Sequence, residues 1–210
     1  MQFPEVLADP PGPTTVPPPR EIDLAGAAGA VRALLTALGE DPSSAHLAGT
    51  PRRVAEAYAE LLVPRPFVLT TFPNDEGYDE LVMARDIPFR SLCEHHLFPF
   101  HGVAHVGYYP GRRILGLSKF ARVVEHFARG LQVQERLTIQ ISGWLQDHLE
   151  PEGVGVVMEA EHLCMTMRGV QATGSRTVTS ALYGLPREDS RSRQEFFALA
   201  GIHAASRSSS

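Results

Sequence analysis

The chain has 210 residues, of which 43% are hydrophobic and 20% are charged, and its formal net charge is −5. These values are typical of a globular protein with one sizeable core, and the negative balance argues against nucleic acid as a partner. No apolar run approaches the ~20 residues that span a bilayer, and the N-terminus lacks the features of a secretory signal. We therefore expect a cytoplasmic protein without membrane or nucleic-acid partners.

The first part of the chain divides into two regions. Residues 1–20 contain seven prolines and no periodic apolar pattern, which predicts a disordered arm. Residues 21–68 predict a helical hairpin, whose second helix starts near Thr50 because this threonine can cap and Pro51 suits the first helical position. The hairpin has too little core to be independent, so we expect it to pack on the rest of the protein or on another subunit.

The rest of the sequence predicts one catalytic domain over residues 69–205, followed by a polar tail at 206–210. Apolar alternation and helical periodicity give the order β-β-α-α-β-β. This order is typical of an α+β domain with an antiparallel sheet. The predicted strands cover 81–92, 102–109, 153–168 and 174–183, and the predicted helices cover 118–130 and 134–149.

The two cysteines of the chain each lie close to histidine. Cys93 begins the run Cys-Glu-His-His, and Cys164 lies two residues after His162. Thiolate and imidazole ligands together favour zinc. If residues 156–168 form a strand, alternate side chains share a face, so that an imidazole, a thiol and a guanidinium lie in a row. That face would hold His162, Cys164, Thr166 and Arg168, and the core face would hold Leu163, Met165 and Met167.

Other interpretations of the same residues remain open. Taken alone, Cys164 is more often a buried small hydrophobe, and His162 is more often a satisfied core histidine. A closed structural zinc site of Cys93, His96, His162 and Cys164 would fill all four tetrahedral positions and leave no place for substrate. The spacing does not decide between this closed site and an open catalytic one.

Two further groups of polar residues could bind a ligand. Ser118 can cap a helix, and Lys119 and Arg122 lie on neighbouring positions of its first turns, which suits an anion site. The simpler alternative is a solvated basic face. Gln134 and Glu135 offer an amide and a carboxylate that could read the edge of a guanine-like ring, although an ordinary polar helix start explains them equally well.

Five segments, in this order and at these separations, closely resemble the GTP cyclohydrolase I family. The resemblance covers roughly residues 22–205 and leaves only the proline-rich arm and the polar tail outside it. The segments are TPRRVAEAYAELL (50–62), CEHHLFPFHG (93–102), GLSKFARVVEHFA (116–128), LQVQERLT (131–138) and EAEHLCMTMRGV (159–170).

The resemblance implies a role for each matching residue. It implies an open zinc site, with His162 beside the metal rather than bound to it. The implied zinc ligands are Cys93, His96 and Cys164, and the implied catalytic residues are His95, His162 and Ser118. The implied triphosphate-binding cations are Arg53, Lys119, Arg122 and Arg168, and the implied guanine-recognition pair is Gln134 and Glu135.

The resemblance also implies a reaction and an assembly. The family converts GTP and water to 7,8-dihydroneopterin triphosphate and formate, the first step of folate and pterin biosynthesis, and His95 is our candidate for protonating N7 of the ring. The implied tunnelling fold is a four-stranded antiparallel sheet with two helices on one face. Its usual assembly is a toroidal homodecamer of two stacked pentamers, with sites at subunit interfaces.

Three alternatives stay under consideration. A fold-mate such as a queuosine-pathway reductase would share the architecture, but the zinc set and the triphosphate cations disfavour it. A paralogue that stops after ring opening would keep the same site residues. A zinc-stabilised ring without catalytic activity would require the closed four-ligand site.

Overall fold

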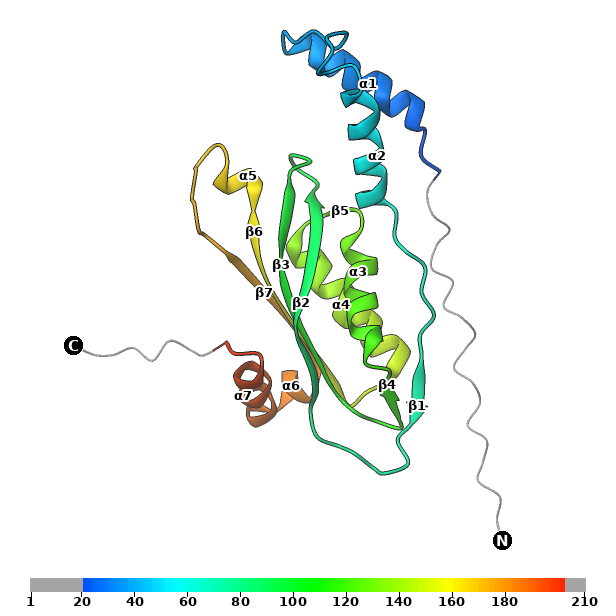
Figure 1. Ribbon diagram of the computed structural model, residues 1–210. Coiled ribbons are helices and arrows are strands. Elements are labelled where there is room, and N and C mark those ends of the chain that lie inside the picture. The colour runs from blue at the N-terminus through cyan, green and yellow to red at the C-terminus, as the bar shows by residue number, and fades with distance from the viewer. Residues whose placement is uncertain (1–20, 203–210) are drawn as a thin grey trace, which may run out of the picture.

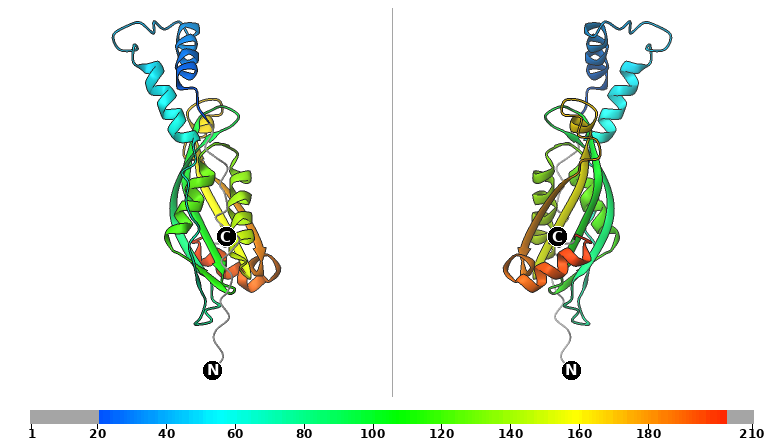
Figure 2. Two further views of the ribbon diagram at one scale, coloured as in Figure 1. Left: turned by 90° about the vertical axis from the view of Figure 1, so that its right-hand side faces the viewer. Right: turned by 90° about the vertical axis from the view of Figure 1, so that its left-hand side faces the viewer.

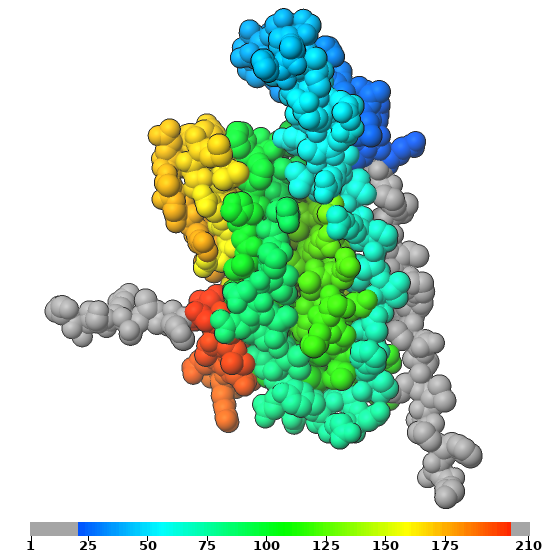
Figure 3. Space-filling model, viewed as in Figure 1, coloured from blue at the N-terminus to red at the C-terminus, as the bar shows by residue number. Residues whose placement is uncertain are grey.

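The computed structural model describes residues 21–202, so the predicted arm at 1–20 and the predicted tail at 206–210 lie outside the described residues. Two helices, α1 (Leu24–Ala37) and α2 (Thr50–Leu62), contact each other and project beyond the end of the sheet domain (Figures 1 and 3). No residue of α1 is buried, although the helix carries several leucines. The N-cap of α2 is Gly49 and not Thr50, so the predicted cap was wrong by one residue.

The centre of the molecule is a sheet in the order β5-β2-β3-β6-β7. Its four main strands are antiparallel, whereas the two-residue β5 pairs in parallel with the end of β2. These pairings confirm the predicted four-stranded antiparallel sheet and add a short fifth strand. The strands are β2 (Val82–Cys93), β3 (Pro99–Tyr109), β5 (Leu131–Gln132), β6 (Gly153–His162) and β7 (Thr177–Gly184).

Two long helices, α3 (Ser118–Ala128) and α4 (Gln134–Leu149), cover one face of this sheet (Figure 2). Their apolar faces form the main core with the strands, and Phe100, Val123 and Leu137 are fully buried there. This arrangement confirms the expected α+β fold. Ser118 is the first residue of α3 but makes no capping hydrogen bond, so its predicted capping role was wrong.

The strand predicted to run to residue 168 ends at His162. Its partner β3 begins at Pro99, and the last pair of that ladder joins Phe100 to His162. The neighbouring β7 pairs only as far as Ala160. Because no strand is left to pair with the following residues, the chain turns into a one-turn helix, α5 (Leu163–Thr166).

The predicted alternation of faces after His162 was therefore wrong. Cys164 and Thr166 lie on the short helix, and Arg168 lies in the loop after it. The side chains expected to face the core are not buried, since Met165 is 38% exposed and Met167 is 65% exposed.

The opposite face of the sheet is partly covered by a helix that the sequence did not predict. After α6 (Leu185–Glu188), Asp189 caps α7 (Ser190–Leu199) by accepting a 2.7 Å hydrogen bond from the Ser192 amide. Phe196 of α7 is fully buried in a second core, which also contains Tyr109 and Val157. Two short strands, β1 (Thr71–Pro73) and β4 (Arg113–Leu115), pair beside the start of α3. Among residues 21–202, no helix is both long enough and apolar enough to cross a membrane.

Candidate functional site

A tight loop at the end of β2 presents the first cysteine and both histidines of the Cys-Glu-His-His run. The backbone amide of Cys93 donates to the carbonyl oxygen of Phe98 at 2.8 Å, and the Leu97 amide donates to the carbonyl oxygen of Cys93 at the same distance. Leu97 adopts the left-handed conformation with φ 57°. These contacts close the loop, so that His95 and His96 are exposed while Cys93 is buried.

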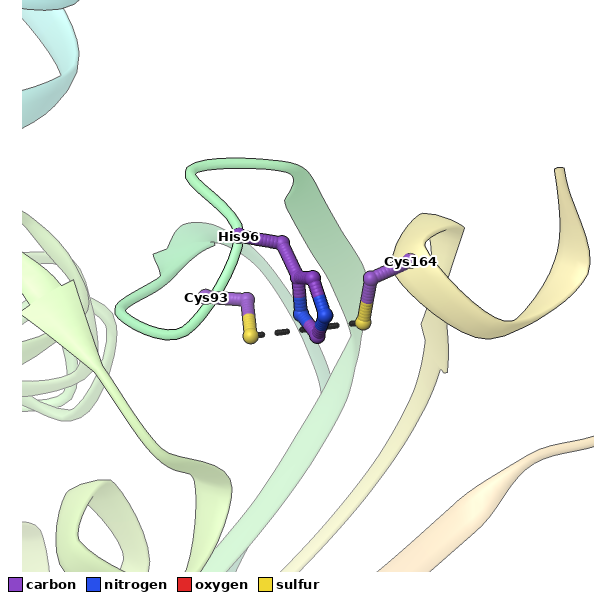
Figure 4. A group of neighbouring side chains, drawn as sticks. All are labelled: Cys93, His96 and Cys164. Atoms are coloured by element: carbon purple, nitrogen blue, oxygen red, sulfur yellow. Dashed lines mark hydrogen bonds between the residues drawn. The ribbon is translucent and has the colours of Figure 1, made fainter. Parts of the chain in front are cut away.

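The short helix α5 brings the second cysteine to this loop (Figure 4). The sulfur atoms of Cys93 and Cys164 lie 4.0 Å apart. With a ring nitrogen of His96 they form a group whose ligand atoms all lie within 4.8 Å of one another, and His162 is not a member of this group. Burial raises the pKa of the Cys164 thiol, and the neighbouring Cys93 adds to this effect.

Arg136 of α4, which sequence reasoning did not single out, holds this loop in place. Its Nη2 donates to a carboxylate oxygen of Glu94 at 2.6 Å and to the carbonyl oxygen of Leu131 at 2.8 Å. Its Nε donates to the side-chain oxygen of Gln132 at 3.0 Å. The hydrogen bond from Arg136 lowers the pKa of the Glu94 carboxyl. Gln132 in turn pairs with Cys93 across β5 and β2, so this network holds a cysteine of the group.

His162, the last residue of β6, lies next to this group in the sequence and in the fold. Its ring stacks on that of Phe100, with a centroid separation of 4.6 Å and an interplanar angle of 3°. Its Nε2 lies 2.8 Å from the side-chain oxygen of Gln134. Burial lowers the pKa of the His162 imidazole, and the charge of Glu135 acts in the opposite direction.

Most of the other polar residues singled out from the sequence lie at this same end of the sheet. The Nδ1 of His95 lies 3.7 Å from the sulfur of Cys93. The Nη1 of Arg168 lies 3.5 Å from Nε2 of His96. The exposed Glu135 is in the first turn of α4, next to Gln134.

Helix α2, which carries Arg53, reaches the same loop. Its Tyr58 hydroxyl donates a 3.1 Å hydrogen bond to the carbonyl oxygen of Leu97. Arg53 lies one to two turns before Tyr58, is exposed, and donates to the Thr50 hydroxyl at 2.9 Å. This cation therefore belongs to the end of the subunit that carries the cysteines.

Helix α3 begins near β4, at the other end of the sheet from the cysteine loop (Figure 1), and its first turns carry Ser118, Lys119 and Arg122. The chain just before them is fixed by Leu115, whose amide donates to the Tyr108 hydroxyl at 2.7 Å. Tyr108 pairs with the first residue of β2, whereas the cysteine loop follows the last. These two positions, Val82 and Cys93, are eleven residues apart on β2, which corresponds to roughly 35 Å at about 3.3 Å per residue. One subunit therefore does not bring the two groups together.

Comparison with known proteins identifies the family. The sequence pattern of the GTP cyclohydrolase I family matches residues 27–201. The chain is 55% identical to GTP cyclohydrolase 1 of Mycobacteroides abscessus over 180 residues, which cover 82% of this chain and 87% of that protein. It is 52% identical to GTP cyclohydrolase 1 of Aquifex aeolicus over 170 residues, which cover 81% and 92% of the two chains.

A third relative agrees with these two. GTP cyclohydrolase 1 of Gloeobacter violaceus is 53% identical over 174 residues, which cover 81% of each chain. The matched region contains both cysteines, the loop histidines and the cations at both ends of the sheet. The chain belongs to the GTP cyclohydrolase I family.

Proposed function

We propose that this protein is a zinc-dependent GTP cyclohydrolase I, which opens the imidazole ring of the guanine of GTP, releases formate and forms 7,8-dihydroneopterin triphosphate. The observation that carries this proposal is the Cys93, His96 and Cys164 group with His95 and His162 beside it, in a chain of this family. The product would enter folate or pterin biosynthesis.

The donor atoms of this group fit zinc. Zinc binds thiolate at about 2.3 Å and imidazole at about 2.0–2.1 Å, so two thiolates on tetrahedral zinc lie about 3.8 Å apart. The sulfur atoms of Cys93 and Cys164 lie 4.0 Å apart, and the His96 nitrogen lies within 4.8 Å of both. Three protein ligands leave the fourth tetrahedral position for water or substrate, which is the arrangement of a catalytic site.

Zinc held in this way would lower the pKa of a bound water, so that hydroxide is available near neutral pH. The residues around the zinc would transfer protons to and from the substrate and would bind its guanine. His95 would donate a proton to N7 of guanine as the ring opens, and His162 would take up and return protons during hydration and loss of formate. The carboxylate of Glu135 would accept hydrogen bonds from the N–H groups of the guanine edge.

The triphosphate would be held by cations from both ends of the subunit, and therefore from different copies of the chain. Arg168 and Arg53 lie at the cysteine end, whereas Ser118, Lys119 and Arg122 lie on the first turns of α3, which begins near the other end of β2. A complete site would form where the two ends of neighbouring copies meet, with Ser118 assisting the later rearrangement of the ribose. The homo-oligomer that we propose is a toroidal decamer, in which such end-to-end contacts repeat around the ring.

A cytoplasmic location suits this chemistry. Both cysteines are free thiols in the structure, and their proposed role requires them to stay reduced. Reducing compartments keep thiols in this state, whereas oxidising ones favour disulfides.

The decisive experiment is incubation of the zinc-loaded protein with GTP, followed by measurement of formate and of the product mass. We expect equimolar formate and dihydroneopterin triphosphate, which becomes fluorescent after oxidation. A product that retains the formyl group or the unrearranged ribose would identify a paralogue that stops early. No consumption of GTP would refute the proposal.

The ligand count can be measured separately. Zinc-edge X-ray absorption should give two sulfur ligands, one imidazole and one oxygen. Two sulfurs with two imidazoles would instead support the closed structural site that includes His162. Replacing His95 with Ala should abolish turnover while the zinc content stays unchanged, and loss of zinc would contradict the role proposed for His95.

A further inference from the structure

The side chain of Gln134 is buried at the start of α4, with only 1% of the residue exposed. Its amide nitrogen Nε2 lies 3.1 Å from the carbonyl oxygen of Met158 and 2.9 Å from the carbonyl oxygen of Thr177. The same nitrogen lies 3.1 Å from the hydroxyl oxygen of Thr179. The amide oxygen Oε1 faces the other way, 2.8 Å from Nε2 of His162.

These neighbours determine which way the amide must be oriented. A carbonyl oxygen carries no proton and can only accept a hydrogen bond. If the amide of Gln134 were flipped, its oxygen Oε1 would lie against the carbonyl oxygens of Met158 and Thr177. None of these three oxygen atoms carries a proton, so no hydrogen bond could form and the oxygens would repel one another. The NH₂ group must therefore point toward β6 and β7, and Oε1 must point toward His162.

A chain of hydroxyl groups supports the same orientation. The Thr138 hydroxyl donates to the main-chain carbonyl of Gln134 at 2.8 Å, so its proton is already used. The Thr138 and Thr179 hydroxyl oxygens lie 2.6 Å apart, which means that Thr179 is the donor in this contact. The Thr179 oxygen is then left to accept from the Gln134 amide. The NH₂ group of Gln134 therefore faces three acceptors, the two carbonyl oxygens and the Thr179 hydroxyl oxygen, and none of them can donate to it.

The orientation of the amide decides the protonation of the His162 ring. Because Oε1 of Gln134 can only accept, the 2.8 Å contact requires a proton on Nε2 of His162. In a neutral imidazole this leaves Nδ1 as the ring nitrogen with a free lone pair. The Phe100 ring, stacked on the imidazole at 4.6 Å, keeps the ring in the plane that this hydrogen bond requires.

We propose that Gln134 is a positioning residue that holds His162 in the Nε2–H tautomer and so reserves Nδ1 for proton exchange with the substrate. The catalytic meaning of this inference rests on the proposed function, whereas the tautomer itself does not. The assignment replaces the expectation that the Gln134 side chain reads guanine, because both ends of its amide are already bonded inside the subunit. Glu135, its exposed neighbour, keeps that role.

The tautomer can be measured directly on the full zinc-loaded protein. Histidine is labelled with ¹⁵N, and spectra are recorded at about pH 8, well above the ordinary imidazole pKa of about 6.5. The signal missing from a His162→Ala sample identifies the ring. We expect protonated Nε2 and unprotonated Nδ1, and the reverse pattern would overturn the proposal. This result does not depend on turnover, so a failure to release formate from GTP would count only against the proposed function.

Kinetics of Gln134→Met separate positioning from guanine recognition. Positioning predicts that kcat falls at least roughly tenfold, with the KM for GTP within about twofold of wild type and an unchanged zinc content. A raised KM with unchanged kcat would overturn it and support guanine recognition. Gln146→Met is the matched control, because it removes another amide from α4, whose Nε2 donates to the Pro151 carbonyl at 3.4 Å, and it should leave kcat and KM unchanged. If Gln134→Met does not fold, the spectrum of the wild-type protein still decides the question.

Discussion

Two impaired variants of this protein should restore each other's activity when their copies assemble together. His95→Ala removes the proposed proton donor at the cysteine end of the subunit, and Lys119→Ala removes a proposed phosphate-binding cation at the other end. A homo-oligomer of either variant has the same defect in all of its sites. Loss of a general acid typically costs about 10²- to 10⁴-fold in rate, so His95→Ala should be close to inactive. Lys119→Ala should lose most of its activity at limiting GTP, because a cation that positions the triphosphate is missing from every site.

The size of the recovery follows from where the two residues lie. The start of α3, which carries Lys119, and the loop that carries His95 are separated by nearly the full length of β2, roughly 35 Å. One GTP molecule cannot contact both residues of the same chain, so each site would combine the ends of two copies. In an equal and random mixture, half of the cysteine ends keep His95 and half of the opposite ends keep Lys119. About a quarter of the sites should therefore combine an end that keeps His95 with an end that keeps Lys119.

The experiment requires mixed oligomers of known composition. The two variants are co-expressed with different tags, and the assemblies that carry both tags are purified and tested for formate release from GTP. We expect about 25% of wild-type activity. The matched control pairs His95→Ala with Cys164→Ser, which damages the same end, and should show no recovery. Equal activity in both mixtures, or none in the first, would refute the assignment of the two ends to different copies.

Three further predictions concern metal binding, packing and pH. Cys164→Ser should lower the zinc content measured by elemental analysis, because a soft thiolate ligand is lost, and retained zinc would contradict its role. Gly155→Ala would place its Cβ 2.4 Å from a ring carbon of the buried Phe196, and should lower the free energy of unfolding in urea by about 1–3 kcal/mol. Gly29→Ala, whose Cβ would meet nothing within 4 Å, is the control that should not destabilise. Burial lowers the pKa of His126 below its usual 6.5, so the unfolded chain takes up the proton first. Stability should therefore fall as the pH drops from about 6.5 toward the lowered value, and His126→Phe should weaken this dependence.

The sequence by itself determined the chemistry that the protein can carry and most of its regular elements. Apolar periodicity is a local property, so it predicted α4 at 134–149 without error. The other elements of the β-β-α-α-β-β order are shifted by at most three residues at their ends, except for the strand predicted to run to residue 168, which ends at His162. The pairing of cysteine with histidine indicated a zinc site, and the order of five motifs identified the family. None of these conclusions required knowledge of what any residue contacts.

Only the tertiary structure decided how these residues are arranged, because their arrangement depends on contacts between distant segments. The strand β6 ends at His162 because its partner strands run out there, and the resulting turn brings Cys164 to within 4.0 Å of Cys93. The carbonyl groups of β6 and β7 orient the amide of Gln134, and thereby the His162 ring. The length of the sheet separates Lys119 from the cysteines, a distance that no local pattern encodes.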